Sequence, residues 1–145
     1  MNDPRITGPD RKSKGMEVRI KRHNTFMLKG VPEAYRAQYA MLPPTLGTIG
    51  EGKDLYDRNC ATCHGADGMG DGNHANALSP SPALLAYMIH RSIAVDEYLL
   101  WSVSGGGAAF GSNMPGFKDK LTPDKIWRVV TYMRAGFPSR KANRR

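Results

Sequence analysis

The chain has 145 residues and a net charge of +8, with 40% hydrophobic and 23% charged residues. This length fits one compact domain with an appendage, and the composition indicates a globular, soluble protein rather than a disordered chain or a membrane bundle. The longest unbroken apolar run, residues 83–89, is far shorter than the ~20 residues of a membrane helix, so we expect no transmembrane segment. Two cysteines are too few for a disulfide-rich scaffold or a four-cysteine zinc module.

The positive charge is concentrated at the two ends of the chain. Residues 1–50 carry a net charge of +5, residues 51–137 of −1, and residues 138–145 of +4. Basic ends can bind nucleic acid, anionic lipid or an acidic protein, or can simply keep a tail solvated. The middle has no basic helix interleaved with aromatic residues, so we expect no nucleic-acid partner.

Residues 1–47 are expected to form an N-terminal extension. The polar residues 1–15 are predicted to be disordered or held by a partner. Residues 16–21 alternate apolar and charged side chains, which predicts a short half-buried strand. Residues 26–42 are rich in apolar side chains and should cover either their own domain or another protein. Two prolines, at positions 43 and 44, end any helix there.

The first helix of the main domain is predicted to begin at Thr48 and to run to the cysteines. Thr48 and Glu51 have the spacing of a capping box, in which each side chain satisfies a free backbone N–H group. The glycines that follow predict a loop over residues 64–81. The pair Ser81 and Pro82 resembles an N-cap and a first-turn proline, which predicts a second helix over 83–91.

Two further helices are expected after this loop and helix. One begins near Asp96 and ends at the glycines of 105–107, and a glycine-rich loop follows. Thr122 and Pro123 repeat the cap-and-proline signal, and Gly136 ends the last helix. The apolar face of that helix consists of Ile126, Val129, Val130 and Met133.

The chemistry is indicated by Cys60, Cys63 and His64, which form a C-x-x-C-H motif, the attachment signal of c-type haem. Two thiols separated by two residues at a helix end can form thioethers with the two vinyl groups of one porphyrin. The adjacent His64 can then offer its imidazole to the iron. A redox dithiol usually stands in a βαβ context, which is missing here. A zinc site would need a further ligand such as His74, because there is no second cysteine pair.

A c-type haem in an electron carrier usually takes a soft sixth ligand, and Met114 is the best candidate. It lies in the loop before the last helix and is followed by Pro115. Met69 is too close in sequence to His64, and other methionines suit core packing. Histidine ligation would have to use His23, His74 or His90.

The chain resembles the bacterial class I monohaem cytochromes c, which are small periplasmic electron carriers. Gly52 and Tyr56 on the first helix could meet the last helix in a close crossing, where the partners would be Trp127, Val130 and Tyr132. The resemblance covers roughly residues 48–137 and leaves 1–47 and the basic tail 138–145 outside. It implies an all-α class I cytochrome c fold, with about four helices around one covalently bound haem. The matching stretches are 52–56, 60–65, 68–72, 96–101, 113–117 and the final helix.

The resemblance also implies roles for single residues. Cys60 and Cys63 would form the thioethers, His64 would be the proximal iron ligand and Met114 the distal one. The family usually has a proline carbonyl that accepts from the proximal histidine ring. The candidates for this acceptor are Pro80 and Pro82.

Two more residues occupy positions where similar sequences offer donors to the haem propionates, namely Arg91 and Trp101. Arg91 could equally be a solvated charge, and Trp101 could simply pack in the core.

The predicted function is one-electron transfer in the periplasm by a haem with His/Met ligation. No apolar stretch follows Met1, so either the protein stays in the cytoplasm or a secretory signal was removed or left out of this numbering. The resemblance implies haem attachment outside the cytoplasmic membrane, which favours the second alternative. The protein would be a free carrier, or the cytochrome subunit of a larger oxidoreductase that it grips through residues 16–44. Its redox partner would be a periplasmic dehydrogenase, reductase or oxidase. The alternative is a haem enzyme or gas-binding sensor with an open sixth coordination site.

Overall fold

A computed structural model describes residues 11–40, 42–75 and 84–138 of the chain. Throughout these ranges the regular structure is helical, without any strand, which confirms the predicted all-α class. None of the described helices is long and apolar enough to cross a membrane. The elements in chain order are α1 (Arg11–Lys29), η1 (Glu33–Tyr35), α2 (Leu46–Asn59), α3 (Ala61–His64), α4 (Leu85–Met88), α5 (Asp96–Gly105), η3 (Ala108–Phe110) and α6 (Pro123–Arg134).

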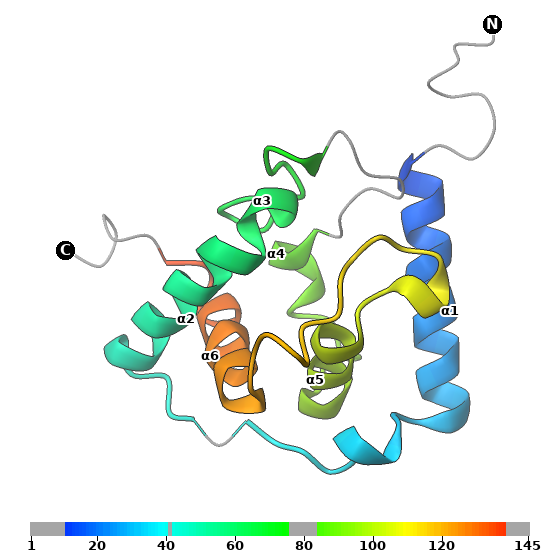
Figure 1. Ribbon diagram of the computed structural model, residues 1–145, viewed down its shortest axis with the longest axis horizontal. Coiled ribbons are helices and arrows are strands. Elements are labelled where there is room, and N and C mark those ends of the chain that lie inside the picture. Colours follow the sequence, from blue (N-terminus) through cyan, green and yellow to red (C-terminus); the bar gives the residue numbers. More distant parts are fainter. Residues whose placement is uncertain (1–10, 41, 76–83, 139–145) are drawn as a thin grey trace, which may run out of the picture.

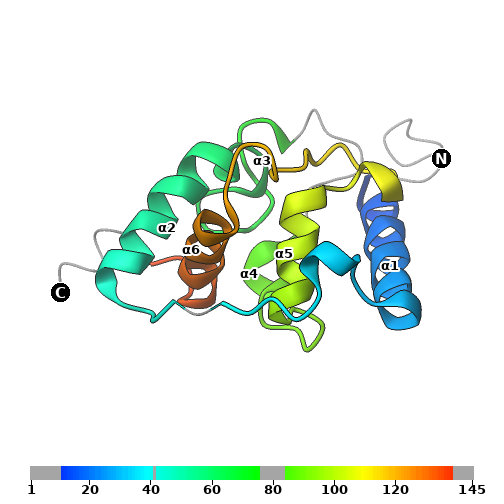
Figure 2. The same cartoon turned by 60° about the horizontal axis from the view of Figure 1, so that its bottom comes forward.

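The centre of the fold is the crossing of α2 and α6, which lie side by side in Figures 1 and 2. A side-chain carbon at Gly52 would lie 2.7 Å from the carbonyl carbon of Arg128 and 2.9 Å from Cβ of Tyr132. Only glycine therefore allows the two backbones to approach this closely. The predicted close crossing is confirmed, with Arg128 and Tyr132 as the residues of α6 that meet Gly52.

The last helix forms as its caps predict. The Thr122 hydroxyl accepts a hydrogen bond from the Lys125 amide, and Pro123 occupies the first turn. The helix ends at Arg134, and Gly136 follows with a φ of +92°. The predicted apolar face is buried against the core, as expected for Ile126, Val129, Val130 and Met133.

α2 begins two residues before the predicted start. Its N-cap is Thr45, whose hydroxyl accepts from the Thr48 amide at 3.1 Å. Glu51 does not close a capping box, because its carboxylate accepts from Nε of Arg128 on α6 at 2.6 Å. The capping-box prediction at Thr48 was wrong because Thr48 lies inside α2, where its amide already donates to Thr45, and because Glu51 is engaged by Arg128.

The predicted helix over 83–91 is reduced to the single turn α4, with further turns up to Arg91. The N-cap expected at Ser81 and Pro82 lies outside the described residues. α5 begins at Asp96 and ends at Gly105, as predicted.

The strand predicted over 16–21 was wrong, because these residues belong to α1. The helix begins at Arg11, so the expected disorder of residues 11–15 was also wrong, while residues 1–10 lie outside the described ranges. Lysine, arginine, methionine and glutamate favour a helix. Val18 is buried on this helix, and Arg22 and Phe26 follow it at four-residue intervals. These intervals put all three on the same helix face.

Residues 26–42, which include the end of α1, pack against their own domain at several points. The Phe26 ring meets Tyr98 of α5 edge-on, with the ring centroids 5.0 Å apart. The amides of Ala37 and Ala40 donate to the carboxylates of Glu97 and Asp96, each at 2.9 Å. Other apolar side chains of the extension remain exposed, namely Met16, Ile20, Met27, Leu28 and Tyr39.

Candidate functional site

The C-x-x-C-H motif forms a single helical turn directly after α2. Cys60 ends α2 and begins α3, and its carbonyl accepts from the amides of Cys63 (3.2 Å) and His64 (2.9 Å). Both cysteines are free thiols and are half-buried. Residues three apart in a helical turn lie on the same side of it. The donor set, two thiols on one side of a turn and an adjacent imidazole, suits a covalently attached haem.

The glycine-rich loop of residues 65–75 fixes the backbone of α3. Gly65 has a φ of +83°, which favours glycine, and the chain reverses there. A side-chain carbon at Gly72 would clash with the carbonyl oxygen of Thr62, so the loop lies directly on the turn. Three loop amides donate to carbonyls of the turn: Gly70 to His64 (2.7 Å), Gly72 to Cys63 (3.2 Å) and His74 to Thr62 (2.9 Å).

Tyr56 connects this loop to the helix crossing. Its hydroxyl donates to the Gly65 carbonyl at 2.6 Å, and its ring is fully buried near Tyr132 and Phe137. Burial raises the pKa of the Tyr56 hydroxyl well above its ordinary value, so this donor keeps its proton. The sequence indicated Tyr56 for the crossing, but no pattern in it indicated this hydrogen bond.

The electrostatics of Cys60 differ from those of a reactive dithiol. Burial, helped by the nearby Cys63, raises the pKa of the Cys60 thiol to about 12. Redox dithiols and zinc ligands instead stabilise a thiolate. Within the described ranges, no group of three or more His, Cys, Asp or Glu side chains could hold a metal ion, which gives the zinc alternative no support.

Met114 lies in a loop that folds back on the end of α5. In Figures 1 and 2 this loop runs from beside α1, where η3 lies, across to α6. The Met114 carbonyl accepts from the Gly107 amide at 3.0 Å, and its amide donates to Oγ of Ser112 at 3.0 Å. The Met114 side chain is half-buried and packs against the core cluster. The backbone that presents the thioether is thus held on both sides of the residue.

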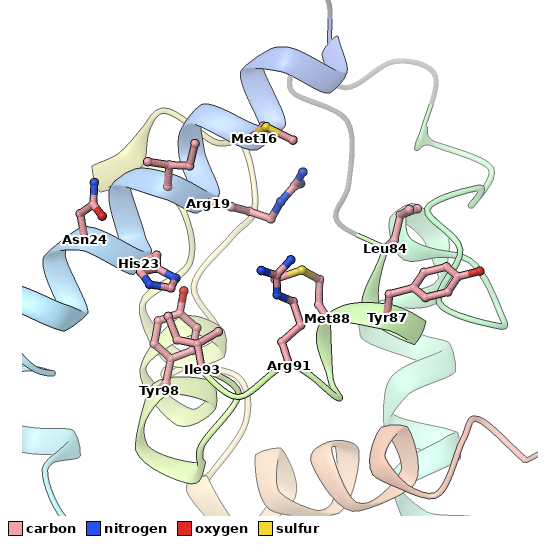
Figure 3. A pocket seen from close by; sticks show the side chains of 11 residues that line it. Met16, Arg19, His23, Asn24, Leu84, Tyr87, Met88, Arg91, Ile93 and Tyr98 are labelled. Carbon is pink, nitrogen blue, oxygen red and sulfur yellow. The ribbon is translucent and has the colours of Figure 1, made fainter.

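A cavity of about 730 Å³ lies between α1 and the α4–α5 region (Figure 3). Arg19 of α1 and Arg91 after α4 point into it from opposite walls. Burial and the positive charge of Arg91 lower the pKa of Arg19. The described lining contains no carboxylate, so this cavity favours an anionic group. Its remaining lining residues are Met16, Ile20, His23, Asn24, Leu84, Tyr87, Met88, Ile93 and Tyr98.

Of the predicted site residues that the structure describes, Arg91 is the one that lines the cavity. Cys60, Cys63, His64 and Met114 do not line it. Trp101 packs between two rings, with its centroid 5.9 Å from Tyr98 and 5.7 Å from Phe110, both edge-on. The proposed carbonyl acceptors of Pro80 and Pro82 lie outside the described residues. Of the alternative histidine ligands, His23, His74 and His90 are all exposed.

Comparison with known proteins decides the family. The family model "Cytochrome c" matches residues 49–136, which is more than half of the chain. The chain belongs to the cytochrome c family.

Two solved structures are similar to this cytochrome c. One is a chain of the reducing HAO-like protein complex of Kuenenia stuttgartiensis, with a TM-score of 0.55 and 24% identity. That match covers 77% of this chain and 53% of the other, so this chain spans about half of that chain's length. The other is cytochrome cL of Methylophaga aminisulfidivorans, with a TM-score of 0.48, 22% identity, and coverage of 83% of this chain and 72% of that one. No curated protein matches the sequence.

Membership of the family means that this cytochrome carries a covalent c-type haem and takes part in electron transfer. Cys60 and Cys63 stand in the attachment spacing, with His64 next to them. The matched range begins at residue 49, so α1 and the segment that follows it lie outside the common domain. The sequence did not indicate Arg19 and Arg22 of α1 as site residues. Arg19 lines the cavity and Arg22 binds the Gly106 carbonyl, and both contacts join distant parts of the chain.

Proposed function

We propose that this cytochrome transfers single electrons through a haem held by Cys60 and Cys63, with His64 and Met114 as axial ligands. The observation that carries the proposal is the α3 turn, which places two free thiols and His64 together on a backbone fixed by loop 65–75. When bound, the haem supplies a one-electron couple at its iron. With both axial positions filled by side chains, the chain itself makes and breaks no bond of a substrate.

The role of the protein residues is to keep the ligand set unchanged in both oxidation states. The His64 amide bonds to the Cys60 carbonyl, and its own carbonyl accepts from the Gly70 amide at 2.7 Å. Met114 is held in a similar way through Gly107 and Ser112. A neutral thioether favours ferrous iron more than a second imidazole would, which raises the reduction potential. Ligands on a fixed backbone need little rearrangement when one electron arrives or leaves.

We assign the cavity arginines to the carboxylates of the haem. Arg91 and Arg19 face each other across the cavity, and a propionate between them would relieve their mutual repulsion. The sequence-based role of Trp101 as a second propionate donor stays a prediction, as does a carbonyl from Pro80 or Pro82 behind His64.

An optical spectrum tests the ligand assignment. The oxidised holoprotein should show a far-red sulfur-to-iron charge-transfer band, and Met114→Ala should abolish it. Met27→Ala is the matched control, because Met27 is exposed on α1 and does not line the cavity of Arg19 and Arg91, and the band should survive there. A high-spin spectrum, or a band that Met114→Ala leaves intact, would contradict the ligation. Rapid carbon monoxide binding by the ferrous wild type would then favour a gas-binding sensor or haem enzyme.

We further propose that the protein works in the periplasm, because the chain resembles the bacterial cytochromes c of that compartment. Its redox partner there would be a dehydrogenase, reductase or oxidase. Met27 and Leu28 are 67% and 84% exposed on α1, which supports stable association through residues 16–44. The hydrodynamic size in a native extract tests this association. A species of 16.0 kDa would contradict it and favour a free carrier.

A further inference from the structure

Arg22 links the N-terminal helix to the loop that carries Met114. Its Nη2 donates to the Gly106 carbonyl at 2.9 Å, across 84 positions of sequence. Its guanidinium carbon also lies 5.2 Å from the ring centroid of Phe110, in cation–π geometry. The side chain is half-buried, and its Nε is buried without a hydrogen-bond partner among the described residues. Burying this guanidinium costs solvation free energy, and both of its contacts, with Gly106 and Phe110, are made to the loop that carries Met114.

The carbonyl that Arg22 binds belongs to the tightest part of the loop. A side-chain carbon at Gly106 would lie 2.7 Å from the Met114 carbonyl oxygen and 2.6 Å from the Gly116 amide. The next amide, that of Gly107, donates to the same Met114 carbonyl at 3.0 Å. The Gly106 carbonyl and the Gly107 amide belong to one peptide group, so Arg22 binds one side of the peptide whose other side holds Met114.

The rest of the loop is held mainly by its own backbone, since the amides of Phe110 and Ser112 both donate to the Gly107 carbonyl at 2.9 Å. Ala108, Ala109 and Gly111 are exposed, and Gly111 has a φ of +87°. Glycine and alanine bury little apolar surface, so the loop gains little stability from packing of its own side chains. The Arg22 contact is a charge-assisted hydrogen bond, which is about twice as strong as a neutral one. It ties the loop to α1, a helix far from it in the sequence.

We propose that Arg22 is a positioning residue that holds the 106–114 loop in the conformation from which Met114 binds the haem iron. This inference rests on the proposed ligation by Met114. A thioether is a weak, neutral ligand, so its competition with other ligands depends on how firmly its backbone is held. Helix α1, which lies outside the matched domain, thereby acts on the sixth coordination position without touching it.

The experiment uses the full-length holoprotein and azide as a competing ligand. Arg22→Met removes the charge and the hydrogen bond but keeps an unbranched side chain. It should lower the azide concentration that half-displaces the sulfur-to-iron band by about tenfold. Arg22→Lys keeps the charge and should recover part of the loss. The matched control is Lys21→Met, because Lys21 is the exposed neighbour on the same helix and should behave as wild type.

Amide hydrogen exchange supplies a readout that does not depend on the iron. In Arg22→Met the Gly107 amide should exchange faster, while amides of α6 keep the wild-type rate. Equal acceleration in α6 would mean a general loss of stability, and would overturn the positioning role. So would an azide titration equal to that of Lys21→Met.

Met114→Ala separates the two proposals. If it abolishes the band while Arg22→Met leaves the azide titration unchanged, the positioning role is wrong and the ligation stands. If the band survives in Met114→Ala, both the ligation and the inference built on it are wrong.

Discussion

The α2–α6 crossing is closed by the chain's own side chains, whereas a cavity of about 730 Å³ that is partly open to solvent lies beside α1. At the crossing, Tyr56, Tyr132 and Phe137 pack ring against ring, with centroids 5.3–5.5 Å apart. On the other side, α1 stands apart from this core in both general views. It is held there by side-chain contacts such as those of Arg22 and Phe26.

The two regions differ in whether the polypeptide fills its own interior. A crossing with a glycine contact and buried aromatic rings tolerates little change, because close-packed interiors have no space to give. A cavity with facing arginines and apolar walls is instead suited to a group that the chain does not supply. The predictions below test each side of this comparison, beginning with the largest expected effect.

Replacing both attachment residues, Cys60→Ser with Cys63→Ser, should abolish cooperative folding. A domain of this size with glycine-rich loops buries too little surface to be stable without the haem. We expect the purified, haem-free variant to lose most helical circular dichroism at room temperature, unlike the wild-type holoprotein. A sigmoidal thermal transition in the haem-free variant would show that the α2–α6 crossing is sufficient alone.

Gly52→Val should lower the free energy of unfolding of the holoprotein by about 3 kcal/mol. The added side chain would meet the backbone of Arg128, which cannot move without separating the helices. Guanidinium unfolding followed by circular dichroism measures the change. Gly50→Ala is the control on the same helix, because nothing lies within 4 Å of a side-chain carbon there. It should raise stability by about 0.5–1 kcal/mol, and equal losses in both variants would contradict the close contact.

Tyr56→Phe should lower the free energy of unfolding by about 1–2 kcal/mol, because the Gly65 carbonyl loses its buried donor. Chemical unfolding of the holoprotein measures this loss. Tyr87 is 62% exposed, so Tyr87→Phe is a control that should leave stability within error. A Tyr56→Phe variant as stable as this control would mean that the hydrogen bond contributes nothing to the fold.

The smallest effect concerns alkaline pH. Burial, with Asp57 and Asp67 nearby, raises the pKa of Tyr132 from 10.0 to about 12. A raised folded-state pKa means that this tyrosine's contribution is complete below pH 10 and is lost as the pH rises toward 12. The Tyr132→Phe holoprotein should therefore lose less unfolding free energy than wild type between these pH values. Parallel pH profiles for the two proteins would show that Tyr132 titrates equally in the folded and unfolded chains.

The elements predictable from sequence are those set by signals within one turn of helix. The Thr122–Pro123 cap and the four-residue apolar periodicity of α6 act locally, so the helix and its buried face followed directly. The capping box at Thr48 failed for the opposite reason. Glu51 has a better partner in Arg128, 77 positions away, and no local pattern could show that.

The same distinction applies to the candidate site. The attachment turn was predictable because its three residues are almost consecutive, and the family match agrees with it. The contacts of Arg22 and Arg19 were not predictable, since the alternation over 16–21 predicts a strand where the structure has α1. Alternation over six residues is ambiguous when the polar residues are lysine and arginine, whose long alkyl stems also suit a helix. The axial role of Met114 stays a prediction from its place in the sequence.

Loop 65–75 has a consequence for how the protein folds. Its backbone bonds join residues 62–64 to residues 70–74, so each closes only a short stretch of chain. Short closures lose little entropy and form quickly. The contact of Gly52 with Arg128, by contrast, must wait for α6. The attachment turn can therefore close within its own short stretch of chain, whereas the helix crossing needs the whole domain.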